Sequence, residues 1–136
     1  MRNGERLWSS ERSKGNGGEA HHLYPMNVKT GFRLLDLARS ITDDTLTLLD
    51  ASSRRFIHEG QIGDAVGSIP YTIREGYGRE GNDRKQFLRV ARASAEETDE
   101  RLRTNYVARR LDEKRHWQLH TRLVVVRKMI DAILSE

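Results

Sequence analysis

The fold of this chain is decided by Ser68-Ile69-Pro70-Tyr71-Thr72-Ile73-Arg74-Glu75-Gly76-Tyr77-Gly78-Arg79, followed after a short gap by Phe87-Leu88-Arg89-Val90-Ala91-Arg92-Ala93-Ser94. Apolar residues keep helical spacing up to Ile73 in the first stretch and through the second. Between them, Glu75, Gly76 and Gly78 form a corner, where the glycines supply the backbone freedom that ends a helix. Asn82 is placed to cap the helix that follows. We therefore expect two helices joined by a glycine corner.

Working outward from this corner, apolar stripes at 3- and 4-residue steps predict four helices, over residues 30–50, 56–75, 83–108 and 112–134. Pro70 should bend the second helix. Short connections favour antiparallel neighbours, so the predicted fold is all-α, an up-down-up-down four-helix bundle over residues 27–136. Residues 1–26 are rich in Gly, Ser, Arg and Glu without a sustained period. They predict a flexible, disordered leader, with an arm that orders on a partner as the alternative.

Composition excludes several classes of protein. The chain has no Cys, which rules out disulfides, thiolate metal sites and a cysteine nucleophile. No apolar run approaches the roughly 18 residues of a membrane helix, and the N-terminal residues lack the apolar core of a signal peptide. We therefore expect a cytoplasmic protein with no membrane partner.

Metal binding and catalysis have weak candidates. Glu113-x-x-His116, with His120 one turn further, copies half of a di-iron carboxylate pattern. The second half is missing from the predicted bundle, so we expect no metal, no cofactor and histidines on a wet surface. Glu75 is expected to pair with an arginine or to cap amides at the corner. No nucleophile elbow or phosphate loop is present, and the chain is predicted not to be an enzyme.

Basic residues gather around the corner. Arginine makes up 19 of the 24 basic residues, and the formal net charge is +4. The candidate nucleic-acid contacts are Arg74, Arg79, Arg84, Lys85, Arg89 and Arg92, with Tyr77 as a ring on which a base could stack. Lys85, Arg89 and Arg92 share one helix face. The alternative is that these arginines only cover the helix surface in ion pairs, as expected for a second cluster at residues 101–115.

The last helix is apolar on more than one side. Val124, Val125 and Met129 fall outside its core stripe, which predicts that another copy of the chain covers them. These three residues are the candidate oligomer interface.

The motifs of the corner also carry a resemblance. Ser-Ile-Pro, then Ile-x-Glu-Gly-x-Gly-Arg, then Phe-Leu-x-x-Ala-x-x-Ser resembles the signature of the 23S ribosomal RNA intervening-sequence proteins, over roughly residues 27–134. The resemblance implies a four-helix bundle that forms a ring-shaped homopentamer. It also implies kinship with accessory proteins of diversity-generating retroelements, which bind nucleic acid and a reverse transcriptase.

Together these observations predict a non-enzymatic, oligomeric accessory protein that contacts RNA or DNA through its basic face. The alternative is a structural oligomer that docks a protein partner, such as a reverse transcriptase, and has no nucleic-acid role of its own.

Overall fold

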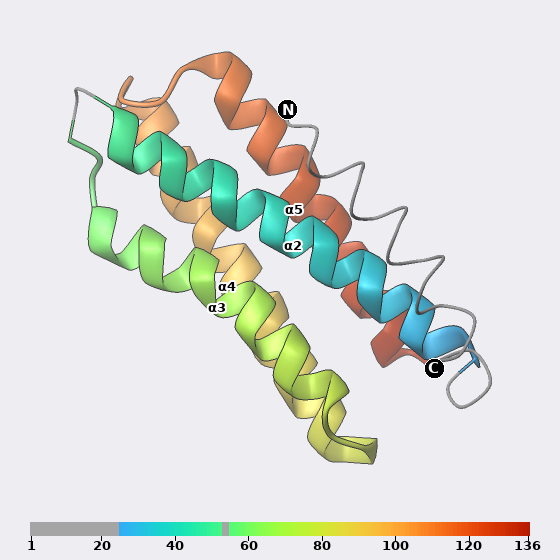
Figure 1. Cartoon of the computed structure of the whole chain (residues 1–136). Helices are drawn as coiled ribbons and strands as arrows, with labels where there is room; N and C mark the ends of the chain where they lie inside the picture. Colours follow the sequence, from blue (N-terminus) through green and yellow to red (C-terminus); the bar gives the residue numbers. More distant parts are fainter. Residues whose placement is uncertain (1–24, 53–54) are drawn as a thin grey trace.

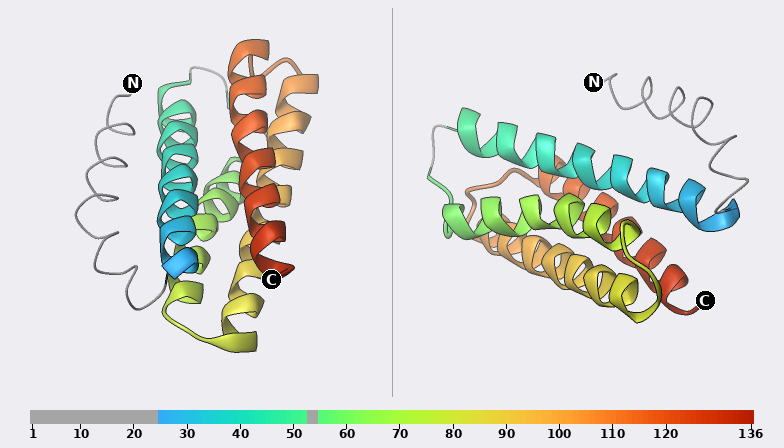
Figure 2. Two further views of the ribbon diagram at one scale, coloured as in Figure 1. Left: turned by 90° about the vertical axis from the view of Figure 1, so that its right-hand side faces the viewer. Right: turned by 60° about the horizontal axis from the view of Figure 1, so that its bottom comes forward.

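The structure, a computed structural model, describes residues 25–52 and 55–136. Its elements are α2 (Pro25–Ala51), α3 (Glu59–Tyr77), α4 (Gly81–Val107) and α5 (Glu113–Leu134). Successive helices run in opposite directions (Figures 1 and 2), and each packs against two neighbours, in the cyclic order α2, α3, α4, α5. The predicted all-α four-helix bundle is confirmed. No helix in these two described ranges is long and apolar enough to cross a membrane.

The core lies along the common axis of the four helices. Most of its side chains are the predicted stripe residues, including Leu34, Ala38 and Ile41 of α2, Ile62, Val66, Ile69 and Ile73 of α3, Leu88, Ala91, Ala95 and Leu102 of α4, and Leu119, Leu123, Val126, Ile130 and Ile133 of α5. The small residues of α4 let α3 approach closely. Burying an aliphatic side chain of this size stabilises the fold by about 1.5–3 kcal/mol.

Pro70 lies inside α3 and leaves one backbone acceptor without its helical donor. A proline has no amide hydrogen, so the carbonyl of Val66, four residues earlier, loses its usual partner. The hydroxyl of Thr42 on α2 lies 2.9 Å from that carbonyl and 3.0 Å from the carbonyl of Ala38. Thr42 therefore supplies the missing hydrogen bond and ties α2 to α3 at the proline.

Several predicted boundaries are wrong. Helix α2 begins at Pro25, five residues before the predicted start at residue 30, and residues 1–24 of the predicted leader lie outside the described residues. Helix α3 begins at Glu59, three residues later than expected. Asn82 is not a cap, because α4 begins at Gly81 and its N-cap is Glu80, whose side chain makes no capping hydrogen bond.

The glycines of the corner act differently from the prediction. Gly78 has an ordinary φ of −87°, and the positive φ belongs to Gly81, at +57°. Gly76 is buried where α3 meets α4, and a Cβ built on it would lie 3.2 Å from the Cβ of Phe87. Gly76 therefore lies at a close contact between α3 and α4, whereas the left-handed turn of the backbone falls at Gly81.

At the other end of the bundle, buried Asn105 joins two connections. Its Oδ1 accepts from the Ile57 amide at 2.7 Å, and its Nδ2 donates to the carbonyls of Ile57 at 3.1 Å and Arg101 at 2.8 Å. The carbonyl of Asn105 accepts from the amides of Arg110 and Leu111. The Asn105 side chain thus holds the α2–α3 connection against the end of α4. The backbone carbonyl of the same residue holds the α4–α5 connection.

Candidate functional site

The α3–α4 corner turns the chain within three residues. The Gly78 amide donates to the Glu75 carbonyl and the Arg79 amide donates to the Gly76 carbonyl, each at 3.1 Å. Glu80 is extended and Gly81 takes up the positive φ. Glu75 lies 3.6 Å from Arg79, so the expected pairing of Glu75 with an arginine is confirmed.

Three of the six predicted cations have partners within the protein. Arg79 pairs with Asp83 at 3.2 Å and lies over the Phe87 ring. Arg84 Nε donates to the carbonyls of Gly76 and Arg79, and its guanidinium lies 4.9 Å from the centre of the Tyr77 ring. These two arginines brace the corner.

Arg92 of α4 pairs with a carboxylate of its own helix and with one on α5. Its Nε lies 2.6 Å from the Asp131 carboxylate, and Glu96 contacts its Nη1 at 2.9 Å. The hydrogen bond and charge of Asp131, with the charge of Glu96, raise the pKa of Arg92. Arg92 is therefore neutralised by two carboxylates, although it shares the predicted face with Lys85 and Arg89.

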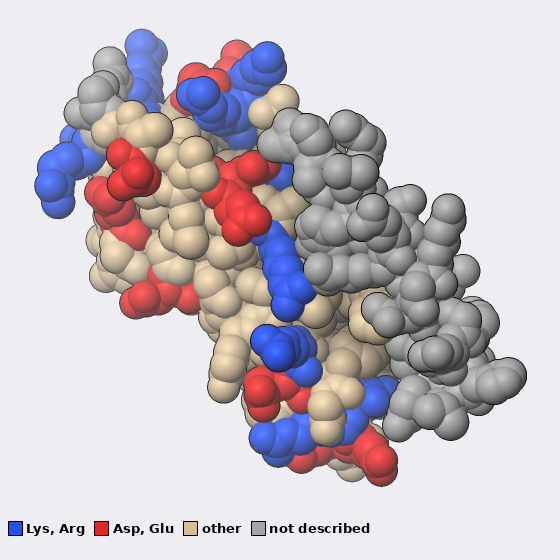
Figure 3. All heavy atoms as spheres, in the orientation of Figure 1, with Lys and Arg blue, Asp and Glu red and all other residues tan. Residues whose placement is uncertain are grey.

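The other three cations have no carboxylate partner among the described residues. Arg74 and Arg89 are exposed, Lys85 is half-buried, and Arg89 has only a 3.4 Å contact with the Gln86 amide oxygen. On the face shown in Figure 3, Lys and Arg side chains alternate with Asp and Glu. The corner therefore offers separate free cations, and no large patch of one sign covers that face.

Tyr77 is packed against α2. A Cβ built on Gly31 would lie 2.8 Å from the Tyr77 ring, so any other residue at position 31 would require the ring to shift. The guanidinium of Arg84 covers the ring, and the hydroxyl is buried without a partner in the described part of the chain. Burial raises the pKa of Tyr77 to about 12. The ring is thus a packing element, whereas the sequence suggested a free stacking surface.

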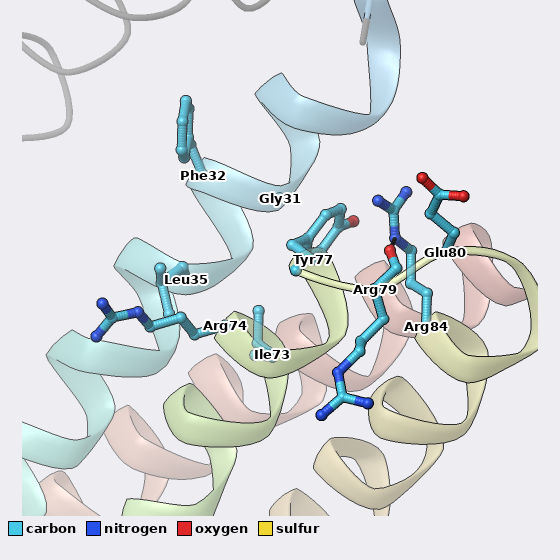
Figure 4. A pocket seen from close by; sticks show the side chains of 10 residues that line it. Gly31, Phe32, Leu35, Ile73, Arg74, Tyr77, Arg79, Glu80 and Arg84 are labelled. Carbon is cyan, nitrogen blue, oxygen red and sulfur yellow. Dashed lines mark hydrogen bonds between the residues drawn. The ribbon is translucent and has the colours of Figure 1, made fainter.

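A pocket of about 530 Å³ opens between α2 and α3 beside the corner (Figure 4). Phe32 and Leu35 line it from α2, and Ile73, Arg74 and Tyr77 line it from α3. Arg84 and Glu80 stand at its far edge, while the guanidinium of Arg79 points away from it. The volume lies within the range of small-molecule sites. Sequence spacing placed Phe32 and Leu35 in the core stripe, and nothing in that spacing signals a pocket.

Of the two α5 histidines predicted to lie on a wet surface, His116 is buried, contrary to the prediction, whereas the His120 side chain is 34% exposed. His116 is 3% exposed and stacks on Tyr106, with ring centres 4.3 Å apart. Burial lowers the pKa of His116, and the charges of His120 and Arg103 add to that effect against the opposing charge of Asp99. His120 Nδ1 lies 2.9 Å from the carboxylate of buried Asp99, which Arg127 also approaches. Among the described residues, no three His, Asp or Glu side chains converge as a metal site would require.

The candidate oligomer residues differ in exposure. Val125 is 42% exposed, Val124 is half-buried, and Met129 packs against the core. Trp117, which the sequence did not single out, is 48% exposed on the same helix.

Comparison with known proteins agrees with this architecture. The sequence profile of the family described as "23S rRNA-intervening sequence protein" matches residues 33–132. Among solved structures, the chain is similar to a protein of unknown function from the S23 ribosomal protein family of Bacteroides thetaiotaomicron. The TM-score is 0.73 at 17% identity, over 79% of this chain and 99% of that one. None of the curated proteins matches this chain. With a matched region that spans most of the sequence and all four helices, the chain belongs to the 23S rRNA-intervening sequence protein family.

Proposed function

We propose that this protein is a non-enzymatic binding protein that contacts nucleic acid at the α3–α4 corner. The observation that carries the proposal is the set of three cations, Arg74, Lys85 and Arg89, that have no carboxylate partner in the described chain. A cation already bound to a carboxylate gains little from a phosphate, whereas a free one releases counterions when it binds.

The same corner gives this contact a rigid base. Arg79 and Arg84 hold the turn through backbone carbonyls, acidic side chains and two aromatic rings. The free cations therefore project from a fixed frame, so the side chains alone lose freedom on binding.

The test is binding of fluorescent single-stranded RNA at increasing salt. Each phosphate contact contributes about 0.7 to the slope of log affinity against log salt for single strands. Lys85→Glu/Arg89→Glu should lower both affinity and slope. Lys114→Glu/Lys128→Glu changes the net charge equally at exposed sites on α5, and should leave most binding intact. Equal losses in both variants, or no binding by the wild type at low salt, would refute the proposal.

A second copy of the chain is the partner we propose for the outer face of α5. Val125 and Trp117 are both more than 40% exposed there, and Val124 is half-buried. Burying such side chains in a second copy would remove apolar area from water. Light scattering should show a multimer that Val125→Glu dissociates. Val90→Glu, at an equally exposed valine on α4, should not. A monomeric wild type at micromolar concentration would contradict this assembly.

A further inference from the structure

We propose that the pocket between α2 and α3 receives one unstacked base of a single-stranded nucleic acid. This inference rests on the proposed nucleic-acid contact. It adds that one base of the bound strand enters the pocket. It predicts a preference for single strands over duplexes.

The lining of the pocket has the composition that such a base requires. Phe32, Leu35 and Tyr77 are half-buried apolar side chains of the lining, whereas Ile73 is fully buried, and Arg74 and Arg84 lie on opposite sides of Tyr77 (Figure 4). Arg74 has no acidic partner in the described chain. An apolar space flanked by guanidinium groups suits a flat heterocycle whose neighbouring phosphates are anionic.

Phe32 is the residue that favours this occupant. It lines the pocket from α2, yet it is not among the half-buried side chains that pack against the core of the described residues. Phe32 is half-buried without packing on that core, and every base has a face that can stack on such a ring. A peptide side chain could fill the same volume. It would not both stack on the Phe32 ring and place anionic groups beside Arg74 and Arg84, as a nucleotide would.

A duplex should bind less well at this site. Its bases are paired and stacked, and one must be extruded before it can enter a pocket, which costs unstacking energy. A single strand can present a base without that step. Phosphate contacts alone would not distinguish the two forms so strongly.

The experiment measures the anisotropy of labelled oligoadenylate of about ten nucleotides, within the usual range of single-strand sites. The two controls are an RNA duplex of mixed sequence, long enough to stay paired at the assay salt, and the same strand with its bases removed. The wild type should bind the intact single strand at least about fivefold more tightly than either, which is the lower end of one stacking contact. Phe32→Ala should lose that preference and keep the salt dependence. Tyr71→Ala, at an exposed aromatic on α3 that does not line this pocket, is the matched control.

The outcomes separate the two proposals. If the wild type binds no strand at low salt, both fail. If it binds with a salt dependence but Phe32→Ala behaves like the control, or the duplex and the base-free strand bind as well as the intact strand, only the pocket assignment fails. Displacement of the RNA by an equimolar peptide of alternating Glu and Leu, in a manner that depends on Phe32, would also overturn it, in favour of a protein ligand. Thermal unfolding of both variants should match the wild type, so that loss of binding is not loss of fold.

Discussion

The two ends of the bundle, one with the α2–α3 and α4–α5 connections and the other with the α3–α4 corner, are built in different ways (Figure 1). At the α4–α5 end, Asn105 is fully buried. Its side chain bonds to the backbone of the α2–α3 connection, and its backbone carbonyl accepts from amides of the α4–α5 connection. At the α3–α4 end, exposed arginines hold the turn, the N-cap makes no side-chain hydrogen bond, and a pocket opens beside it. One end contributes stability through buried polar bonds, and the other leaves cations and apolar surface available to a ligand.

The largest effect should come from Asn105→Ala. It leaves the amide and carbonyl of Ile57 without their partners, and an unsatisfied buried group costs about 1–3 kcal/mol. We expect a loss of about 3 kcal/mol in the free energy of unfolding, measured in urea. Asn82→Ala, at an exposed asparagine of the same helix, should change it by less than about 0.5 kcal/mol. If the two variants lost similar free energies of unfolding, the buried Asn105 end would not be the more stabilising end of the bundle.

The next effect concerns the close approach of α3 and α4. Gly76→Ala would place a methyl group 3.2 Å from Phe87 and 3.4 Å from the Arg84 carbonyl, and overpacking of this kind costs about 1–3 kcal/mol. Gly67→Ala, in the same helix, meets nothing within 4 Å and should stabilise α3 by up to about 1 kcal/mol. Opposite signs in thermal unfolding would confirm that Gly76 is a packing residue.

The caps give a smaller contrast. The Asp112 side chain accepts from the Arg115 amide at 3.0 Å, whereas Glu80 makes no such bond. Asp112→Ala should cost about 1 kcal/mol and Glu80→Ala only a few tenths. The hydrogen bond from Arg115 lowers the pKa of Asp112. The stabilisation is therefore present above the unfolded pKa of about 3.9 and is lost as the pH falls through the lower folded value. If Asp112→Ala and Glu80→Ala lowered the free energy of unfolding equally at pH 7, the Asp112 cap would not be the stabilising one.

The smallest effect is a pH dependence at His116. Its pKa is lowered by burial, so the unfolded chain binds a proton more readily than the folded one. Stability should be full above the unfolded pKa of about 6.5 and should fall as the pH drops toward the folded value. His116→Phe retains a ring against Tyr106 and should flatten this slope in thermal unfolding between pH 5 and pH 8. An unchanged slope would mean that another group titrates.

Periodicity was sufficient to predict the helices and their buried stripes. Residues spaced like Leu119, Leu123 and Val126 lie on one face of a helix, and in a bundle that face is buried. It failed where a residue's role depends on another helix. His116 looked like a surface residue because its partner, Tyr106, lies on α4. Asn82 looked like a cap because its type suits one, but Gly81 turns the backbone earlier. The sequence identified the cluster of basic residues around the corner. It could not identify a carboxylate partner such as Asp131 for Arg92, because that residue lies far away in the sequence.

The bonds of Asn105 to Ile57 join residues 48 positions apart, and they have a consequence for engineering. Extra residues inserted beside Ile57 would pull that amide from its acceptor, so a linker or a fused domain should not be placed there. The exposed tip at Gly78 and Arg79 is held only by contacts with residues between 75 and 87, so an insertion there should break no bond between distant parts of the chain. A reporter domain grafted at that tip would sit beside the pocket while the opposite end of the molecule stays closed.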